Sequence, residues 1–215
     1  MLTTLATWAQ REWLDPLQTL ADIRWWDHVP LTTVESLLTE LNQTASAAPA
    51  VRANAVRKAL GQAILLASKL LKEGEPSSRD PWLALAGSLG TLPDAAIPGL
   101  LETLFGRPLN RLAAYGSLRP GESNFDQVSM INGCWVDGKV KGRVWQPDEY
   151  LEFAWDVTAP AMEVRVLISS DLYEHIERLD QFEGECYRRI LVPVLIAESV
   201  SICHIYEGVR IGFRV

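Results

Sequence analysis

The segment 115–123, with the sequence YGSLRPGES, combines residue types that can hold an anion or a polarised carbonyl oxygen. Its glycines and proline predict a tight turn directly after a short strand, and Gly116 permits a backbone approach that a Cβ would block. Consecutive backbone N–H groups in such a turn can form a concavity for an anion, and Arg119 adds a cation. On local chemistry alone, a strand-ending turn with a solvent-facing arginine is the commoner explanation.

Glu183 is the second candidate for chemistry, because it closes a predicted helix over residues 170–182. Three apolar residues of this helix share one face at i, i+4 and i+7 spacing: Leu172, Ile176 and Leu179. If the last turn is helical, Glu183 lies on the same face and Gly184 ends the helix just beyond it. Partial burial and the negative end of the helix dipole would both disfavour a charged carboxylate there. A carboxyl with a raised pKa suits proton transfer near neutral pH, whereas a frayed last turn would leave Glu183 in water.

Strand-like alternation surrounds these two segments and indicates the sheet that must position them. Five strands are predicted, over residues 112–115, 139–145, 163–169, 190–197 and 200–206. Asp137-Gly138 predicts a tight hairpin turn before the second of these strands. Five strands with one helix predict a small sheet or a partly closed barrel of α+β character.

The pattern before about residue 110 is helical instead. The tetrapeptide TTVE at 32–35 predicts a capping box that opens a helix, and the longest predicted helix covers residues 49–72, with Gly74 as its stop. Another helix is predicted over residues 93–105, and Trp25 and Trp26 are expected to pack in a core. The sequence therefore predicts an all-α helical bundle of unknown role over residues 1–108 and a second domain over residues 109–215.

Composition narrows the class of function. Of the 215 residues 48% are hydrophobic, so the chain can build a core, and the net charge of −7 argues against a nucleic-acid or membrane partner. The three cysteines have no CxxC spacing and the three histidines have no metal-binding spacing. We therefore expect reduced thiols in a cytoplasmic protein without a metal site. Cys186 is expected to be a half-buried structural thiol, because no base lies near it in the sequence.

The two candidate segments together resemble the γ-glutamylcyclotransferase-like (AIG2-like) family over about residues 112–206. YGSLRPG at 115–121 is similar to the YGSL/YGTL loop of that family. LDQFEG at 179–184, followed by Tyr187 and Arg189, is similar to its LDxxEG…YxR segment. Either motif alone is a weak signal, but both occur in the family's order, one after a strand and the other at the end of a helix.

The resemblance implies a small mixed β-barrel and an enzyme that needs no cofactor. In the implied reaction, the α-amine of a small γ-glutamyl compound attacks its own γ-carbonyl, which closes 5-oxoproline and expels an amine. The resemblance makes Glu183 the catalytic acid/base. The implied substrate-binding residues are Tyr115, Gly116, Ser117, Leu118, Arg119 and Tyr187.

A different class of function stays open from the sequence. A non-catalytic module of the same fold would bind a small acid or a protein without converting it. The N-terminal helices would then contact a partner, or would mediate self-association.

Overall fold

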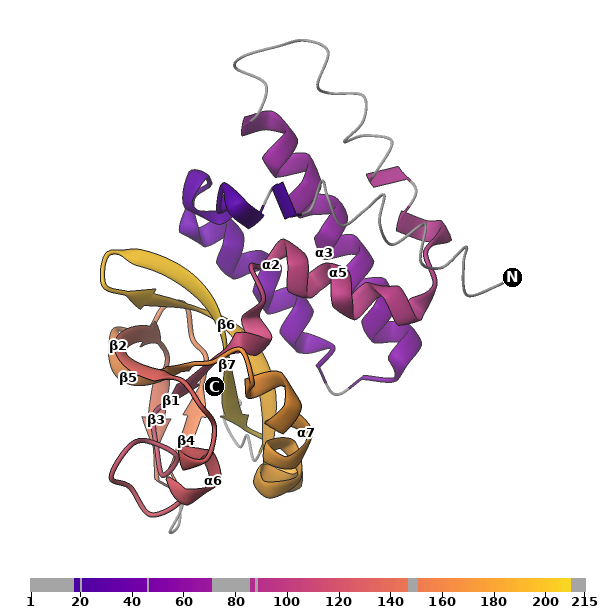
Figure 1. The fold of residues 1–215 in the computed structure, drawn as a ribbon. Coiled ribbons are helices and arrows are strands. Elements are labelled where there is room, and N and C mark those ends of the chain that lie inside the picture. Colours follow the sequence, from indigo (N-terminus) through magenta and orange to yellow (C-terminus); the bar gives the residue numbers. More distant parts are fainter. Residues whose placement is uncertain are drawn as a thin grey trace. The chain divides into compact units, whose positions relative to one another are not determined.

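The computed structural model describes residues 18–70 except 20 and 46, residues 86–146 except 88, and residues 151–209. The chain divides into two compact units, Met1–Arg107 and Pro108–Val215. Both units are drawn in Figure 1. Each unit has its own regular elements and is described separately.

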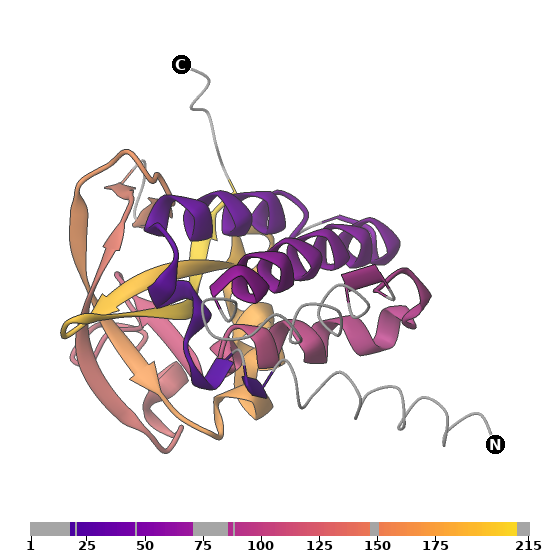
Figure 2. The same cartoon turned by 90° about the horizontal axis from the view of Figure 1, so that it is seen from above.

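Every regular element described in the first unit is helical. These elements are η1 (Trp25–His28), α2 (Leu31–Gln43), α3 (Pro49–Leu70), η4 (Leu89–Thr91), η5 (Asp94–Ala96) and α5 (Ile97–Leu104). Helices α2, α3 and α5 lie side by side in Figures 1 and 2. The predicted end of the long helix, Lys72 to Gly74, lies outside the described residues. None of the helices that the structure describes is long and apolar enough to cross a bilayer.

The two tryptophans of η1 are core residues, as the sequence predicted. Both are buried, and the ring centroids of Trp25 and Phe105 are 5.7 Å apart. The indole Nε1 of Trp25 donates a hydrogen bond to the carbonyl oxygen of Leu104 at 3.1 Å. The polar atom of this large side chain is therefore satisfied inside the core.

The predicted capping box is wrong. Helix α2 begins at Leu31, directly after Pro30, and no side chain caps its N-terminus. Glu35 is a buried residue within this helix. Pro30 has φ −54°, a value that its ring fixes, and it occupies the N-cap position two residues before Thr32, which the TTVE pattern indicated.

The second unit is a closed, mixed β-barrel. Its strands are β1 (Arg111–Ala114), β2 (Cys134–Lys141), β5 (Ala161–Ile168), β6 (Tyr187–Ile196) and β7 (Ser199–Gly208). The order around the barrel is β1-β5-β2-β6-β7, and β7 closes it by pairing in parallel with β1 while the other ladders are antiparallel. The predicted α+β class and the mixed barrel after a helical region are thereby confirmed.

Short elements complete this unit (Figure 1). They are η6 (Pro108–Asn110), α6 (Asp126–Ser129), the two-stranded sheet of β3 (Arg143–Trp145) and β4 (Glu152–Ala154), α7 (Leu172–Glu183) and η7 (Gly184–Cys186). The sequence analysis missed β4, which has only three residues and so shows almost no alternation.

The hairpin turn predicted at Asp137-Gly138 is also wrong. Both residues lie inside β2 and pair with β5, with Gly138 opposite Val164. A Cβ on Gly138 would lie only 2.8 Å from Cγ1 of Val194, so crowding between strands explains this glycine. The strand predicted over residues 139–145 is divided at Gly142, where a Cβ would clash with the ring of Phe153.

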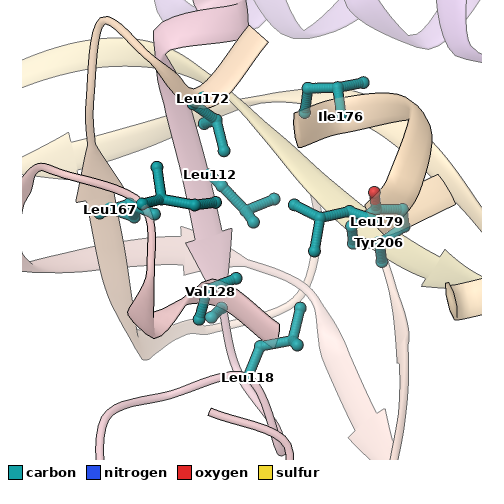
Figure 3. Close-up of a cluster of buried hydrophobic side chains, with 10 residues drawn as sticks. Leu112, Leu118, Val128, Leu167, Leu172, Ile176, Leu179 and Tyr206 are labelled. Atoms are coloured by element: carbon teal, nitrogen blue, oxygen red, sulfur yellow. The ribbon is translucent and has the colours of Figure 1, made fainter. Parts of the chain in front are cut away.

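Helix α7 packs on the barrel through one apolar cluster. Figure 3 shows the three helix residues together with side chains from the barrel and its connections: Leu172, Ile176, Leu179, Leu112, Leu118, Val128, Leu167 and Tyr206. Leu112 comes from β1, whose end leads into the segment 115–118. The cluster therefore joins the two segments that carry the candidate chemistry.

Replacing Gly138 by Ala is expected to destabilise the barrel by about 1–3 kcal/mol, because the new Cβ would press on Val194 and Val166. Equilibrium urea unfolding measures this change. Gly116→Ala is the matched control in the same unit, since its nearest neighbour would be Leu151 Cβ at 3.9 Å. Its unfolding free energy should stay within about 1 kcal/mol of wild type. Equal losses in the two variants would contradict the packing explanation.

Candidate active site

The loop that follows β1 is held in shape by its own hydrogen bonds. Asn124 donates twice to Ser117, from its backbone N–H to the carbonyl oxygen at 3.0 Å and from Nδ2 to Oγ at 2.9 Å. Leu118 is buried in the cluster beneath α7, and Gly121 has φ +87°, which glycine adopts without strain. These contacts fix the backbone of residues 116–118.

Two backbone donors of this loop are available to a ligand. Among the described residues, no carbonyl accepts a hydrogen bond from the N–H groups of Ser117 and Leu118. Adjacent free N–H groups in a turn can hold an anion or a polarised oxygen. Gly116 is not required by the fold itself, because a Cβ there would make only ordinary contact with Leu151.

Helix α7 places Glu183 as its apolar spacing predicted. Leu172, Ile176 and Leu179 are buried, and Glu183 continues their face as the last residue of the helix. Gly184 ends the helix at φ +62°. The alternative of a frayed last turn is therefore wrong.

The environment of Glu183 favours its neutral form. Burial raises the pKa of its carboxyl, and the nearby Asp180 carboxylate raises it further, to about 7. At neutral pH the group is thus divided between acid and carboxylate. A side chain in this state can both accept and donate a proton.

The loop and Glu183 face one cavity of about 300 Å³. Every residue that the sequence analysis proposed for the site lines it: Tyr115, Gly116, Ser117, Leu118, Arg119, Glu183 and Tyr187. Beyond the segment 115–123, the cavity has walls that the sequence did not predict, among them Asn124, Gln146, Leu151 and Tyr206. Gln146, Leu151 and Tyr206 are far from that segment along the chain, so only the folded structure brings them to it.

Two tyrosines of the cavity bind the same backbone group. The hydroxyls of Tyr115 and Tyr187 donate to the carbonyl oxygen of Leu151, at 3.4 and 3.2 Å. Burial, together with Tyr187 and Glu183, raises the pKa of Tyr115 far above its usual value. Tyr115 therefore stays protonated as a donor and fixes Leu151 beside the loop.

The positive charge of the loop is already paired. Arg119 Nη2 lies 3.0 Å from Glu122 Oε1, and its Nε donates to the carbonyl oxygen of Gly116 at 3.3 Å. Both charged side chains are partly exposed. The pair therefore leaves little net charge at the rim of the cavity.

Cys186 differs from its prediction, because it is exposed and not half-buried. It lies in the short helix η7 after Gly184, where the chain leaves the apolar face of α7. Within the described ranges, no group of three or more His, Cys, Asp and Glu side chains is placed to hold a metal ion.

Comparison with known proteins identifies the family of the barrel. Residues 112–209 match the profile of the family described as "Gamma-glutamyl cyclotransferase, AIG2-like". This match confirms the resemblance that the two motifs indicated. The comparison with curated proteins gives no significant match.

Several solved structures are similar to part of the chain. YkqA from Bacillus subtilis is 22% identical over 46% of this chain and 36% of its own, with a TM-score of 0.40. The uncharacterized protein PH0828 from Pyrococcus horikoshii is 18% identical over 46% of this chain and 76% of its own, with a TM-score of 0.37. The K. lactis urea amidolyase is 14% identical over 57% of this chain and 10% of its own, with a TM-score of 0.39. The chain thus spans about a third of YkqA, and TM-scores this low carry no conclusion about function.

The raised pKa of Glu183 makes a prediction about stability. The folded protein binds this proton more tightly than the unfolded chain, whose carboxyl has a pKa near 4.5. The stabilisation is therefore full below about pH 4.5 and is lost as the pH rises through about 7. As the pH rises from 4.5 to 8, the unfolding free energy of Glu183→Gln should increase relative to that of wild type by on the order of 2–3 kcal/mol.

Urea unfolding of both proteins at several pH values measures this gain. Because other titrating groups are common to both proteins, their contributions cancel in the difference. Glu185→Gln is the control, since Glu185 is exposed two residues further on. A difference between Glu183→Gln and wild type that does not change with pH would show that Glu183 is solvated.

Proposed function

Residues 112–209 belong to the gamma-glutamyl cyclotransferase, AIG2-like family, and on this premise we propose that the barrel converts a small γ-glutamyl amide into 5-oxoproline and a free amine. One observation carries the proposal: a carboxyl with a pKa of about 7 shares a cavity with a loop that offers free backbone N–H groups. Cyclisation of a γ-glutamyl group needs a proton acceptor and donor at one end and an oxyanion site at the other.

The loop has the role of the oxyanion site. In the proposed complex, the γ-carbonyl oxygen lies against the N–H groups of Ser117 and Leu118. Negative charge develops on this oxygen when the carbonyl carbon becomes tetrahedral. Fixed donors stabilise that charge without having to reorganise, and the hydrogen bonds between Asn124 and Ser117 hold the loop in place.

Glu183 has the role of the proton carrier. The neutral α-amine of the substrate attacks the γ-carbonyl carbon and forms the new C–N bond, while the Glu183 carboxylate accepts a proton from the attacking nitrogen. The old C–N bond then breaks, and the Glu183 carboxylic acid returns this proton to the leaving nitrogen. Atoms and charges balance without water and without a covalent enzyme intermediate.

Much of the rate enhancement would come from the shape of the cavity. The attacking and attacked atoms belong to the same molecule, so the enzyme has to hold the chain in its ring-closing conformation. In the proposed complex, the cavity walls formed by Tyr115, Leu151 and Tyr187 hold the substrate in this folded conformation. The mechanism specifies little about the structure of the leaving amine, because only the nitrogen of this amine takes part in the reaction.

The wild-type protein is expected to release 5-oxoproline from at least one compound in a panel of γ-glutamyl amino acids, γ-glutamyl amines and glutathione. Because Glu183 must be ionised and the substrate α-amine must be neutral, kcat/KM should rise with pH, and one step of this rise, from Glu183, should lie at about 7. Glu183→Gln should lower kcat by about 10²–10⁴-fold. Mass spectrometry of the released 5-oxoproline measures both effects.

Glu185→Gln is the matched control and should keep wild-type turnover, because this exposed side chain does not line the cavity. Unchanged turnover in Glu183→Gln would remove Glu183 from the mechanism. If a γ-glutamyl compound binds to the wild type and is recovered intact, the barrel is a binding module and the proposed reaction is wrong.

A further inference from the structure

Asp180 lies one helical turn before Glu183 and is bound from two strands of the barrel. Arg189 of β6 contacts both oxygens of its carboxylate, with Nε 2.8 Å from Oδ1 and Nη2 3.0 Å from Oδ2. The hydroxyl of Tyr206 in β7 donates to Oδ1 at 2.8 Å. A two-point arginine contact of this kind fixes direction as well as distance.

The pairing of β6 with β7 explains why these partners meet. Arg189 lies directly opposite Tyr206 in the antiparallel ladder, so both side chains project from the same face of the sheet. His204 is two residues before Tyr206 and therefore shares this face. Its Nδ1 lies 3.2 Å from Nη1 of Arg189, so the guanidinium is held between His204 and Asp180.

The last turn of α7 needs such an anchor. The helix ends at Glu183, and the left-handed Gly184 prevents its continuation. Carbonyl groups at a helix C-terminus lack partners further along the helix, so final turns tend to fray. Leu179 anchors the apolar side of this turn, and Asp180 anchors the adjacent polar side.

We propose that Asp180 is a positioning residue, which Arg189 and Tyr206 hold so that the last turn of α7 directs the Glu183 carboxyl toward the loop at 116–118. The role in catalysis rests on the proposed function, whereas the geometric role does not. In this arrangement Asp180 does not touch the substrate. It acts through Glu183.

The charge of Asp180 also affects the pKa of Glu183. Burial alone would raise the pKa of Asp180, but the hydrogen bonds and charge of Arg189, with Tyr206 and His204, outweigh burial and lower it. Asp180 thus stays ionised at neutral pH and raises the pKa of Glu183. A cation near a carboxyl lowers its pKa, so loss of the Arg189 charge is expected to raise the pKa of Glu183.

Two tyrosines that line the cavity with Glu183 stay neutral over this range. Tyr115 and Tyr206 have pKa values raised by burial first and then by neighbouring groups that include Glu183, so both stay neutral. Tyr187 completes this wall, and across the cavity Arg119 and Glu122 form a closed ion pair. Removing the charge of Asp180 or of Arg189 should therefore act on Glu183 with opposite signs.

Carbon-13 NMR of glutamate-labelled protein tests the proposal, with the Glu183 signal assigned by its loss in Glu183→Gln. The titration midpoint of Glu183 should fall by at least about 0.5 pH unit in Asp180→Asn and rise by a similar amount in Arg189→Gln. Glu177→Gln is the control, because Glu177 is an exposed carboxylate of the same helix. The Glu183 titration midpoint in Glu177→Gln should equal that in wild type.

Arg189→Lys separates position from charge. It keeps the positive charge but loses the two-point contact, so the Glu183 midpoint should stay within about 0.3 unit while kcat falls at least about tenfold. This variant also carries the test if Asp180→Asn does not fold. Shifts of the same sign in Asp180→Asn and Arg189→Gln, or wild-type kcat in Arg189→Lys, would overturn the proposal.

The two hypotheses fail in different ways. The NMR titration needs no substrate, so it reports on the anchor even if the wild type releases no 5-oxoproline. Conversely, unchanged Glu183 midpoints in an active enzyme would reject the anchor and leave the proposed reaction standing.

Discussion

The packing of one apolar helix face against the barrel is the constraint on which the candidate site depends. Leu172, Ile176 and Leu179 are buried against a cluster that includes Leu112 of β1. Because Glu183 continues this face and β1 continues into the loop at 115–118, the same contact places both groups at one cavity. Each fully buried leucine contributes on the order of 2 kcal/mol to stability. The packing of α7 on the barrel can therefore offset the cost of removing the Glu183 carboxyl from water.

The polar contacts around the helix end refine that placement. Desolvation raises the pKa of Glu183, whereas Asp180 stays ionised because Arg189 and Tyr206 bind it. Two carboxyls one helical turn apart thus have different protonation behaviour, which follows from their partners. Such a separation is typical of sites that transfer protons.

The sequence allowed the main elements to be predicted, and its failures have local causes. The apolar residues of α7 follow a clear helical spacing because one face of the helix packs on a core. The helix and the position of Glu183 could therefore be predicted. Asp137-Gly138 was mistaken for a turn because Gly138 is required by crowding from Val194, a neighbour 56 positions away that no local pattern shows. The site lining from Leu151 and Tyr206, and the contact of Tyr206 with Asp180, depend on how distant parts of the chain pack together and became visible only in the folded chain.

A crystal structure of Glu183→Gln with an uncleaved γ-glutamyl amide tests the central claim most directly. The account predicts the γ-carbonyl oxygen within about 3 Å of the N–H groups of Ser117 and Leu118. It also predicts the α-amine within about 3 Å of the side chain at position 183. A ligand that binds outside the cavity, or that lies in it with its α-amine remote from residue 183, would contradict the account.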